Sequence, residues 1–158
     1  TEAVLDTNGR IDENLITKLY QASNAGVKIK MIIRGMCCLI PGEKGYSENI
    51  EVISIVDKYL EHARVHIYCN DGHELLYLTS ADFMTRNIDN RIEVGFPVYD
   101  EELHKEIKDI INIQLRDNTK AREINSNNTN KYHKTNSAEA HRAQIEIYNY
   151  LKSKNTKN

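Results

Sequence analysis

The sequence predicts an α/β domain, a β-sheet flanked by helices and followed by a C-terminal helical segment. Three observations predict this class. An amphipathic segment ends at a glycine and runs into an apolar strand, which is half of a crossover unit. Short β-type segments follow within residues 52–98, and a long apolar stripe of helical spacing comes after them. With 158 residues, 40% of them hydrophobic, the chain suits one domain with its own core.

The N-terminal part predicts a strand, a helix and a second strand. Residues 15–22 carry apolar side chains at helical spacing, and Gly26 suits the left-handed position after a helix. Residues 27–33 alternate and then become fully apolar, as a strand does on entering a sheet interior. The preceding strand is either residues 3–5 or lies before the sequence given, which starts at Thr1 and reads as a piece of a longer chain.

Four further strands are predicted in the middle of the chain. They cover residues 52–55, 65–68, 75–78 and 92–98, and the Asn-Asp-Gly turn at 70–72 joins the second of them to the third.

The C-terminal part predicts two helices separated by a loop. The first starts near Asp100, and residues 118–136 are polar and Asn-rich, which predicts a flexible loop. Asn136 and Glu139 fit a capping box for the last helix. The apolar positions of the two helices are Leu103, Ile107, Ile110, Ile111 and Leu115, and then Ile145, Tyr148 and Leu151.

Charge and composition exclude several classes. The net charge is −2, so no overall positive field attracts a polyanion. Residues 116–158 nevertheless carry nine Lys and Arg against four Asp and Glu, and the remainder carries 12 against 19. This basic segment could contact a polyanion or an acidic domain, or be ordinary solvated charge. The loop at residues 41–45 has no Gly-Lys-Ser/Thr, so a P-loop is excluded, and no apolar run approaches a membrane span.

One region carries residues suited to chemistry at phosphorus. His62 is followed two residues later by Arg64, then by the polar segment 79–87, and then by Arg91 and Glu93. Imidazole can hold or pass a proton or a phosphoryl group near neutral pH. Guanidinium groups donate in a planar, bidentate way to phosphate oxygens.

The order of these motifs resembles one half of the phospholipase D superfamily, with its His-x-Lys replaced by His62-Ala63-Arg64. A closer resemblance is to the C-terminal domain of the bacterial polyphosphate kinase that acts through a phosphohistidine. Four blocks carry it, at residues 33–39, 47–50, 54–62 and 85–94, and the likeness runs from about residue 3 to about residue 151. It implies a phospholipase-D-like fold with a mixed sheet.

The resemblance also implies roles for particular residues. Arg34 would contact the phosphates of ATP, and His62 would be the second active-site histidine, lying opposite the one that carries the phosphoryl group. Glu93 would pair with His62 and fix its tautomer. The remaining candidates, which would line the path of the phosphate chain, are Arg64, Arg86 and Arg91. From position alone, Arg34 could equally pair with a carboxylate, and Glu93 could pair with Arg91 or Arg86.

Two departures from the resembled families shape the expectation. The phosphoryl-carrying histidine of the kinase lies in a preceding domain, and no equivalent block is present here. We therefore expect residues 1–158 to be the single C-terminal, second phospholipase-D-like domain of a longer enzyme, inactive when isolated. Asp82 stands where phospholipase-D-like proteins usually have Asn, and Thr79 where they have Gly. We expect Asp82 to be a structural hydrogen-bond acceptor.

The implied function is reversible transfer of the ATP γ-phosphoryl group to polyphosphate. Implied partners are ATP and ADP, polyphosphate, the remaining domains of the chain and further copies in a homo-oligomer, with Mg²⁺ arriving on the nucleotide and no specific nucleic acid. The expected location is the cytoplasm, with contact to a membrane surface left open. Two alternatives remain: half of a phospholipase-D-like phosphodiesterase, which leaves residues 34–38 unexplained, and a non-catalytic polyanion-binding domain, which lacks the aromatic-interleaved basic motif of single-strand binders.

Overall fold

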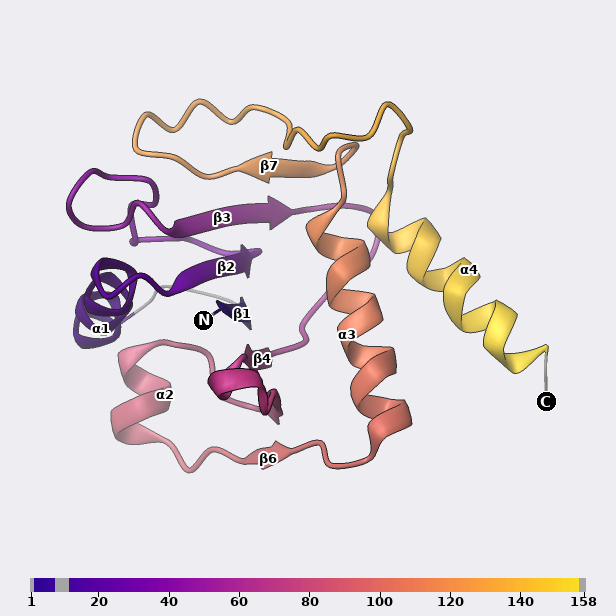
Figure 1. The fold of residues 1–158 in the computed structure, drawn as a ribbon, viewed down its shortest axis with the longest axis horizontal. Helices are drawn as coiled ribbons and strands as arrows, with labels where there is room; N and C mark the ends of the chain where they lie inside the picture. The colour runs from indigo at the N-terminus through magenta and orange to yellow at the C-terminus, as the bar shows by residue number, and fades with distance from the viewer. Residues whose placement is uncertain (1, 8–11, 157–158) are drawn as a thin grey trace.

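The computed structural model describes residues 2–7 and 12–156, and within these ranges the chain forms one mixed sheet of seven strands flanked by helices (Figure 1). The strand order is β6-β5-β4-β1-β2-β3-β7. The strands are β1 (Glu2–Thr7), β2 (Lys28–Ile33), β3 (Ile50–Ile55), β4 (Val65–Tyr68), β5 (Leu75–Thr79), β6 (Gly95–Pro97) and β7 (Ala121–Glu123). The helices are α1 (Glu13–Asn24), α2 (Thr85–Asn90), α3 (Glu101–Leu115) and α4 (Ala143–Asn155), with a 3₁₀ turn, η1, at Asn70–Gly72.

The pairing directions bring many chain segments to one end of the sheet. β1, β2 and β3 are parallel to one another. β4 is antiparallel to β1, β5 to β4, β6 to β5, and β7 to β3. Consequently β1, β2, β3 and β5 finish, and β4, β6 and β7 begin, at the same end. We call it the carboxyl end of the sheet, and loops there face the usual ligand position of α/β folds.

Each face of the sheet has its own apolar core. On one face, residues such as Ile53 and Ile55 of β3 pack with Ile111 of α3 and Ala143 of α4. On the other face, alternate residues such as Val52 pack against α1. Figure 1 shows α1 and α2 to the left of the strands and α3 and α4 to the right.

Helix α1 ends as the sequence predicts, and its start is capped by a side chain that was not predicted. The Asp12 side chain caps it by accepting from the backbone N–H of Asn14 at 2.9 Å, and Gly26 follows its end with φ of 89°. Thr85 Oγ1 of α2 donates to the other Asp12 oxygen at 2.5 Å. This hydrogen bond is the main reason that the pKa of Asp12 is lowered, and it ties α2 to the start of α1.

Three local predictions are corrected. Helix α4 begins at Ala143 rather than at the capping box near Asn136, because the N–H of its first residue, Ala143, finds a distant acceptor in Asp117. Residues 118–136 are not entirely loop, since β7 forms within them and pairs with β3. The strand predicted at 92–98 is confined to β6, and α2 was not predicted.

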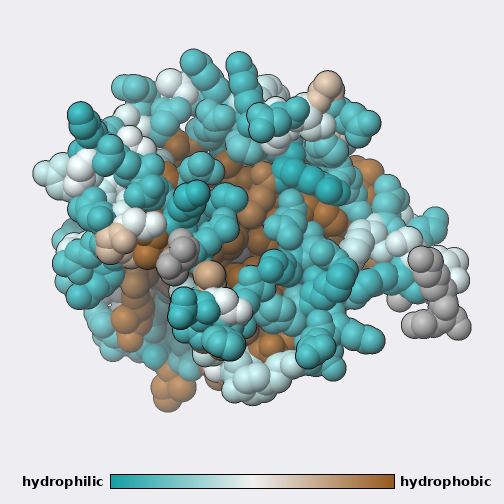
Figure 2. All heavy atoms as spheres, in the orientation of Figure 1, coloured by the Kyte–Doolittle hydropathy of each residue, from teal (hydrophilic) through white to brown (hydrophobic). Residues whose placement is uncertain are grey.

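Figure 2 shows hydrophilic side chains over most of the visible face, with hydrophobic ones exposed in smaller groups between them. No helix within the described ranges is both long enough and apolar enough to cross a membrane.

Candidate functional site

The sheet brings the predicted site residues to its carboxyl end. Arg34 directly follows β2, and His62 and Arg64 precede β4. Glu93 precedes β6, and Arg86 and Arg91 come from α2 and its C-cap, between β5 and β6. Segments up to sixty residues apart in sequence therefore converge, as the order of the motifs predicts.

Arg64 and Asp82 form a nearly buried ion pair. Arg64 Nε donates to Asp82 Oδ1 at 2.7 Å and Nη2 donates to Oδ2 at 3.2 Å, which is a bidentate arrangement. The two side chains are 13% and 9% exposed. The expectation that Asp82 is a structural acceptor is confirmed. The positive charge of Arg64 is therefore balanced by Asp82, and its role in lining the phosphate path stays a prediction.

The same Arg64 guanidinium also contacts His62. Arg64 Nη1 lies 3.1 Å from His62 Nδ1, and Nη2 lies 3.2 Å from Nε2. A neutral imidazole has one acceptor nitrogen, so at most one of these contacts is a hydrogen bond to the ring. The guanidinium also donates to the His62 carbonyl at 3.4 Å, and these contacts together fix the exposed ring beside the buried ion pair.

Glu93 is held by neutral donors rather than by His62. Asn87 Nδ2 donates to Oε1 at 2.6 Å, and the Ser80 hydroxyl donates to Oε2. The pKa of Glu93 is lowered first by the Ser80 hydrogen bond, then by the Asn87 one, with smaller help from the positive charges of Arg91 and Arg64. The expected His62–Glu93 pair is not formed among the described residues, because Arg64 lies against His62 and Ser80 and Asn87 satisfy the carboxylate. The catalytic role of Glu93 stays a prediction.

Ion pairing divides the described arginines into two groups. Arg64, Arg116 and Arg142 pair with Asp82, Glu146 and Asp57. Within the described ranges, the arginines without an ion pair are Arg34, Arg86, Arg91 and Arg122. The alternative in which Arg34 closes its strand by pairing with a carboxylate is therefore wrong for this part of the chain, and its guanidinium is exposed.

Helix α4 makes an unpredicted clasp on the segment leading to His62. Gln144 Oε1 accepts from the backbone N–H of Tyr59 at 2.9 Å, and Gln144 Nε2 donates to Glu61 Oε1 at 2.9 Å. Arg142 donates to both Asp57 oxygens, at 2.7 and 2.8 Å, and this is the main reason that the pKa of Asp57 is lowered. Since these partners lie more than eighty residues apart, no local pattern could have predicted them.

A buried carboxylate anchors the clasp. Asp117 is 0% exposed, and its Oδ2 accepts from the backbone N–H of Ala143 at 2.7 Å. Its Oδ1 accepts from the N–H groups of Thr119, Lys120 and Ala121. One side chain thus joins the end of α3, the start of β7 and the start of α4.

No group of three His, Cys, Asp or Glu side chains within residues 2–7 and 12–156 is arranged to hold a metal ion.

A mixed seven-stranded sheet flanked by helices is a phospholipase-D-like fold. A solved phospholipase D family member from Salmonella typhimurium shares this fold, with a TM-score of 0.58 at 14% identity over 80% of this chain and 83% of that one. At this identity the likeness concerns the fold alone.

The family follows from closer similarities. The model of polyphosphate kinase C-terminal domain 2 matches residues 1–144, and the chain belongs to this family. The polyphosphate kinases of Vibrio vulnificus and Escherichia coli K12 are 53% and 48% identical over 149 residues. The crystal structure of polyphosphate kinase from Porphyromonas gingivalis superposes with a TM-score of 0.94 at 48% identity, covering 99% of this chain and 24% of that one. These two matches span 94% of this chain but only about a fifth (21–22%) of the length of the curated relatives.

Proposed function

We propose that this chain is the part of a polyphosphate kinase that binds the phosphates of ATP and supplies the second active-site histidine. The observation that carries the proposal is the position of Arg34, an exposed cation without an ion pair in the described chain, at the same end of the sheet as His62. Family membership and the names of the relatives support the reaction class.

The proposed reaction has two reversible transfers. A histidine of another domain attacks the γ-phosphorus of ATP, so a P–N bond forms as the bond to the β-phosphate oxygen breaks and ADP leaves. A terminal oxygen of polyphosphate then attacks the same phosphorus, and the P–N bond breaks. Catalysis of such transfers is mostly positioning and charge stabilisation.

Each residue here has a corresponding proposed task. Arg34 binds phosphate oxygens in a bidentate way. His62, oriented by Arg64, moves a proton or stabilises charge opposite the phosphorylated histidine. Arg86 and Arg91 add positive charge along the path of the chain, and Glu93 holds the adjacent turn. Any Mg²⁺ would arrive bound to the nucleotide, where it would neutralise phosphate charge.

The homo-oligomeric state and the cytoplasmic location belong to the same proposal. Association with a membrane surface has no support beyond the open expectation stated above.

The test is Arg34→Ala in the complete enzyme that carries this domain, with Arg116→Ala as the matched control. Arg116 is paired with Glu146 on the surface, so its removal changes the net charge equally at a cation that is already neutralised by a partner. Loss of a charge-assisted phosphate contact costs about 1.5–3 kcal/mol, so we expect the KM for ATP to rise about 10- to 100-fold in Arg34→Ala alone. Unchanged ATP dependence in Arg34→Ala would contradict the assignment, and an enzyme that forms no polyphosphate would contradict the function.

A further inference from the structure

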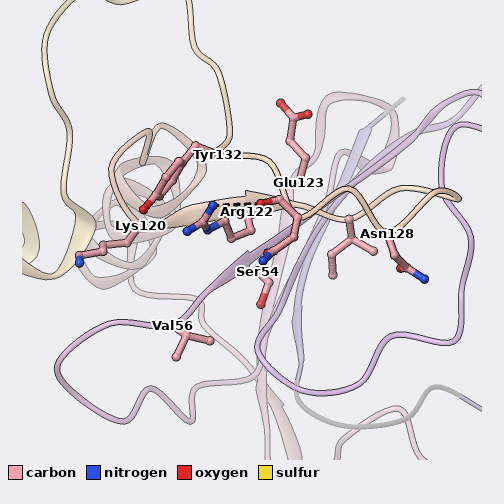
Figure 3. A pocket seen from close by; sticks show the side chains of 9 residues that line it. Ser54, Val56, Lys120, Arg122, Glu123, Asn128 and Tyr132 are labelled. Carbon is pink, nitrogen blue, oxygen red and sulfur yellow. Dashed lines mark hydrogen bonds between the residues drawn. The ribbon is translucent and has the colours of Figure 1, made fainter.

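A groove lies beside the site, over the ladder between β3 and β7. Arg122 is paired in register with Ser54, and Lys120 is two residues before Arg122, so it lies on the same face of the ladder. The residues 124–132 that follow β7 wall the groove, which encloses about 490 Å³. Its polar lining residues are Ser54, Lys120, Arg122, Glu123, Asn128, Asn130 and Tyr132 (Figure 3).

The Arg122 guanidinium is positioned before any ligand binds. The Arg122 guanidinium carbon lies 3.4 Å from the centre of the Tyr132 ring, and Nη1 donates to the Asn130 carbonyl at 2.9 Å. This hydrogen bond uses one of five N–H donors, so most of the fork is available. Lys120 Nζ has no hydrogen bond or ion pair within the described part of the chain, while its backbone N–H is fixed by Asp117 at 2.7 Å.

Nearby carboxylates do not cancel this charge. Glu123 also borders the groove, but its Oε1 accepts from the backbone N–H of Lys134 at 3.3 Å and lies 3.7 Å from His133 Nδ1. Figure 3 shows its carboxylate turned away from Ser54 and Lys120. Asp57 is close enough to Lys120 for the lysine to help lower its pKa, yet both of its oxygens are taken by Arg142.

The groove continues the site sideways along the carboxyl end of the sheet. β7, β3 and β2 are successive neighbours, and Arg34 follows β2. Two strand spacings separate the start of β7 from the end of β2, which is roughly 10 Å. A ligand that reaches both Arg34 and Arg122 must therefore be a chain of several phosphates rather than a single phosphate group.

We propose that Lys120 and Arg122 bind phosphates of a polyphosphate chain several units away from its reacting end. This proposal rests on the proposed function, because it assumes that the chain end is positioned near Arg34 and His62. Arg122 supplies bidentate donation, Lys120 supplies a mobile point charge, and the Ser54 hydroxyl supplies a neutral donor. The Tyr132 ring is engaged by Arg122, which disfavours it as a platform for stacking nucleic-acid bases.

The test compares three forms of the complete enzyme: unmodified, Lys120→Gln/Arg122→Gln, and Lys28→Gln/Lys44→Gln. The control pair removes the same charge at the opposite end of the sheet, since Lys28 begins β2 and Lys44 lies in the loop before β3. Binding of long polyphosphate, triphosphate and a non-hydrolysable ATP analogue is measured by competition at several salt concentrations.

We expect the groove variant to lose about tenfold in affinity for long chains. The slope of log affinity against log salt should become shallower by about 2, because the variant makes two fewer phosphate contacts and so releases fewer counterions on binding. Affinity for triphosphate and for the ATP analogue stays unchanged, and the control pair retains its long-chain affinity. The proposal would be overturned if both variants lost the same affinity for long chains, or if the groove variant lost the same affinity for triphosphate as for long chains. Binding of single-stranded RNA by the unmodified enzyme as strong as its binding of long polyphosphate would also overturn it. Normal ATP binding by the Arg34→Ala enzyme would instead contradict the proposed function, whatever the result for the groove variant.

Discussion

At the scale of single residues, Arg64 and Asp82 show how a charged pair can position a neighbouring side chain. A buried ion pair makes an uncertain contribution to stability, since the cost of removing both charges from water offsets their attraction. Its clear consequence here is geometric. The two bonds to Asp82 fix the guanidinium plane, and the same guanidinium fixes the His62 ring.

A second residue-scale feature predicts a pH effect. His66 of β4 packs with its ring centre 4.7 Å from that of Phe83, and burial lowers the pKa of His66 to about 4. In the unfolded chain the imidazole has its ordinary pKa near 6.5 and takes up a proton first, so the free energy of unfolding falls as the pH drops from about 6.5 to about 4.

We expect His66→Phe to remove this part of the pH dependence. The loss should approach 1.4 kcal/mol per pH unit inside that window in the unmodified chain and be absent from the variant. Urea unfolding at intervals between pH 7 and pH 4 measures it. Replacing the exposed His73 by Phe is the control, and parallel curves for the unmodified chain and His66→Phe would contradict the assignment.

The sequence predicted residue identities better than residue partners. Arg34, His62 and Asp82 could be singled out because each stands beside a recognisable strand end or motif. The predicted partner of Glu93 was wrong. Its observed partners are Ser80, which follows β5, and Asn87, which lies on the short helix α2, whose six residues carry no amphipathic period.

At the scale of elements, the clasp of α4 predicts that a helix distant in sequence orders the His62 segment. Within the described contacts, the Tyr59 N–H donates only to the Gln144 side chain. Gln144 itself is 8% exposed, and its amide also contacts Glu61.

We expect Gln144→Ala to raise the hydrogen-exchange rate of the Tyr59 amide at least tenfold, because the residue it donates to is lost. Amides of the β1–β2 ladder should keep their rates, and the free energy of unfolding should fall by about 1–3 kcal/mol. Gln21→Ala, at an exposed position of α1, is the matched control. A Tyr59 amide that exchanges equally slowly in Gln144→Ala would show that the clasp does not order this segment.

Elements with a strong period were predictable, and those defined by distant partners were not. The alternation of β2 and the stripe of α3 carry enough pattern to be read. β7 has three residues, and its existence depends on the free side of β3. The predicted start of α4 was wrong because the residue that accepts from its first N–H, Asp117, lies 26 residues earlier in the chain.

At the scale of the whole molecule, the fold supplies one half-site. The described residues place one exposed histidine, His62, at the carboxyl end of the sheet, beside cations but without a second histidine loop in those ranges. The proposed reaction needs a nucleophile opposite it.

We therefore expect the 158-residue chain alone to transfer no phosphoryl group from ATP to polyphosphate, whereas the complete enzyme does. The measurement is polyphosphate formation from radiolabelled ATP at equal molar protein. Formation by the isolated chain at more than about a thousandth of the complete enzyme's rate would contradict the half-site. A urea unfolding curve confirms that the isolated chain is folded during the assay.

The clasp also has a consequence for the order of folding. Asp57 and Arg142 are separated by 85 residues, and so are Tyr59 and Gln144. Contacts of such long sequence separation require closure of a long loop, whose entropy cost is met only after nearer contacts have formed. The sheet can therefore assemble while the His62 segment is still unordered. During synthesis, a nascent chain that ends before Arg142 would contain all seven strands but lack the partners that close the site, so the half-site matures only as the last helix docks.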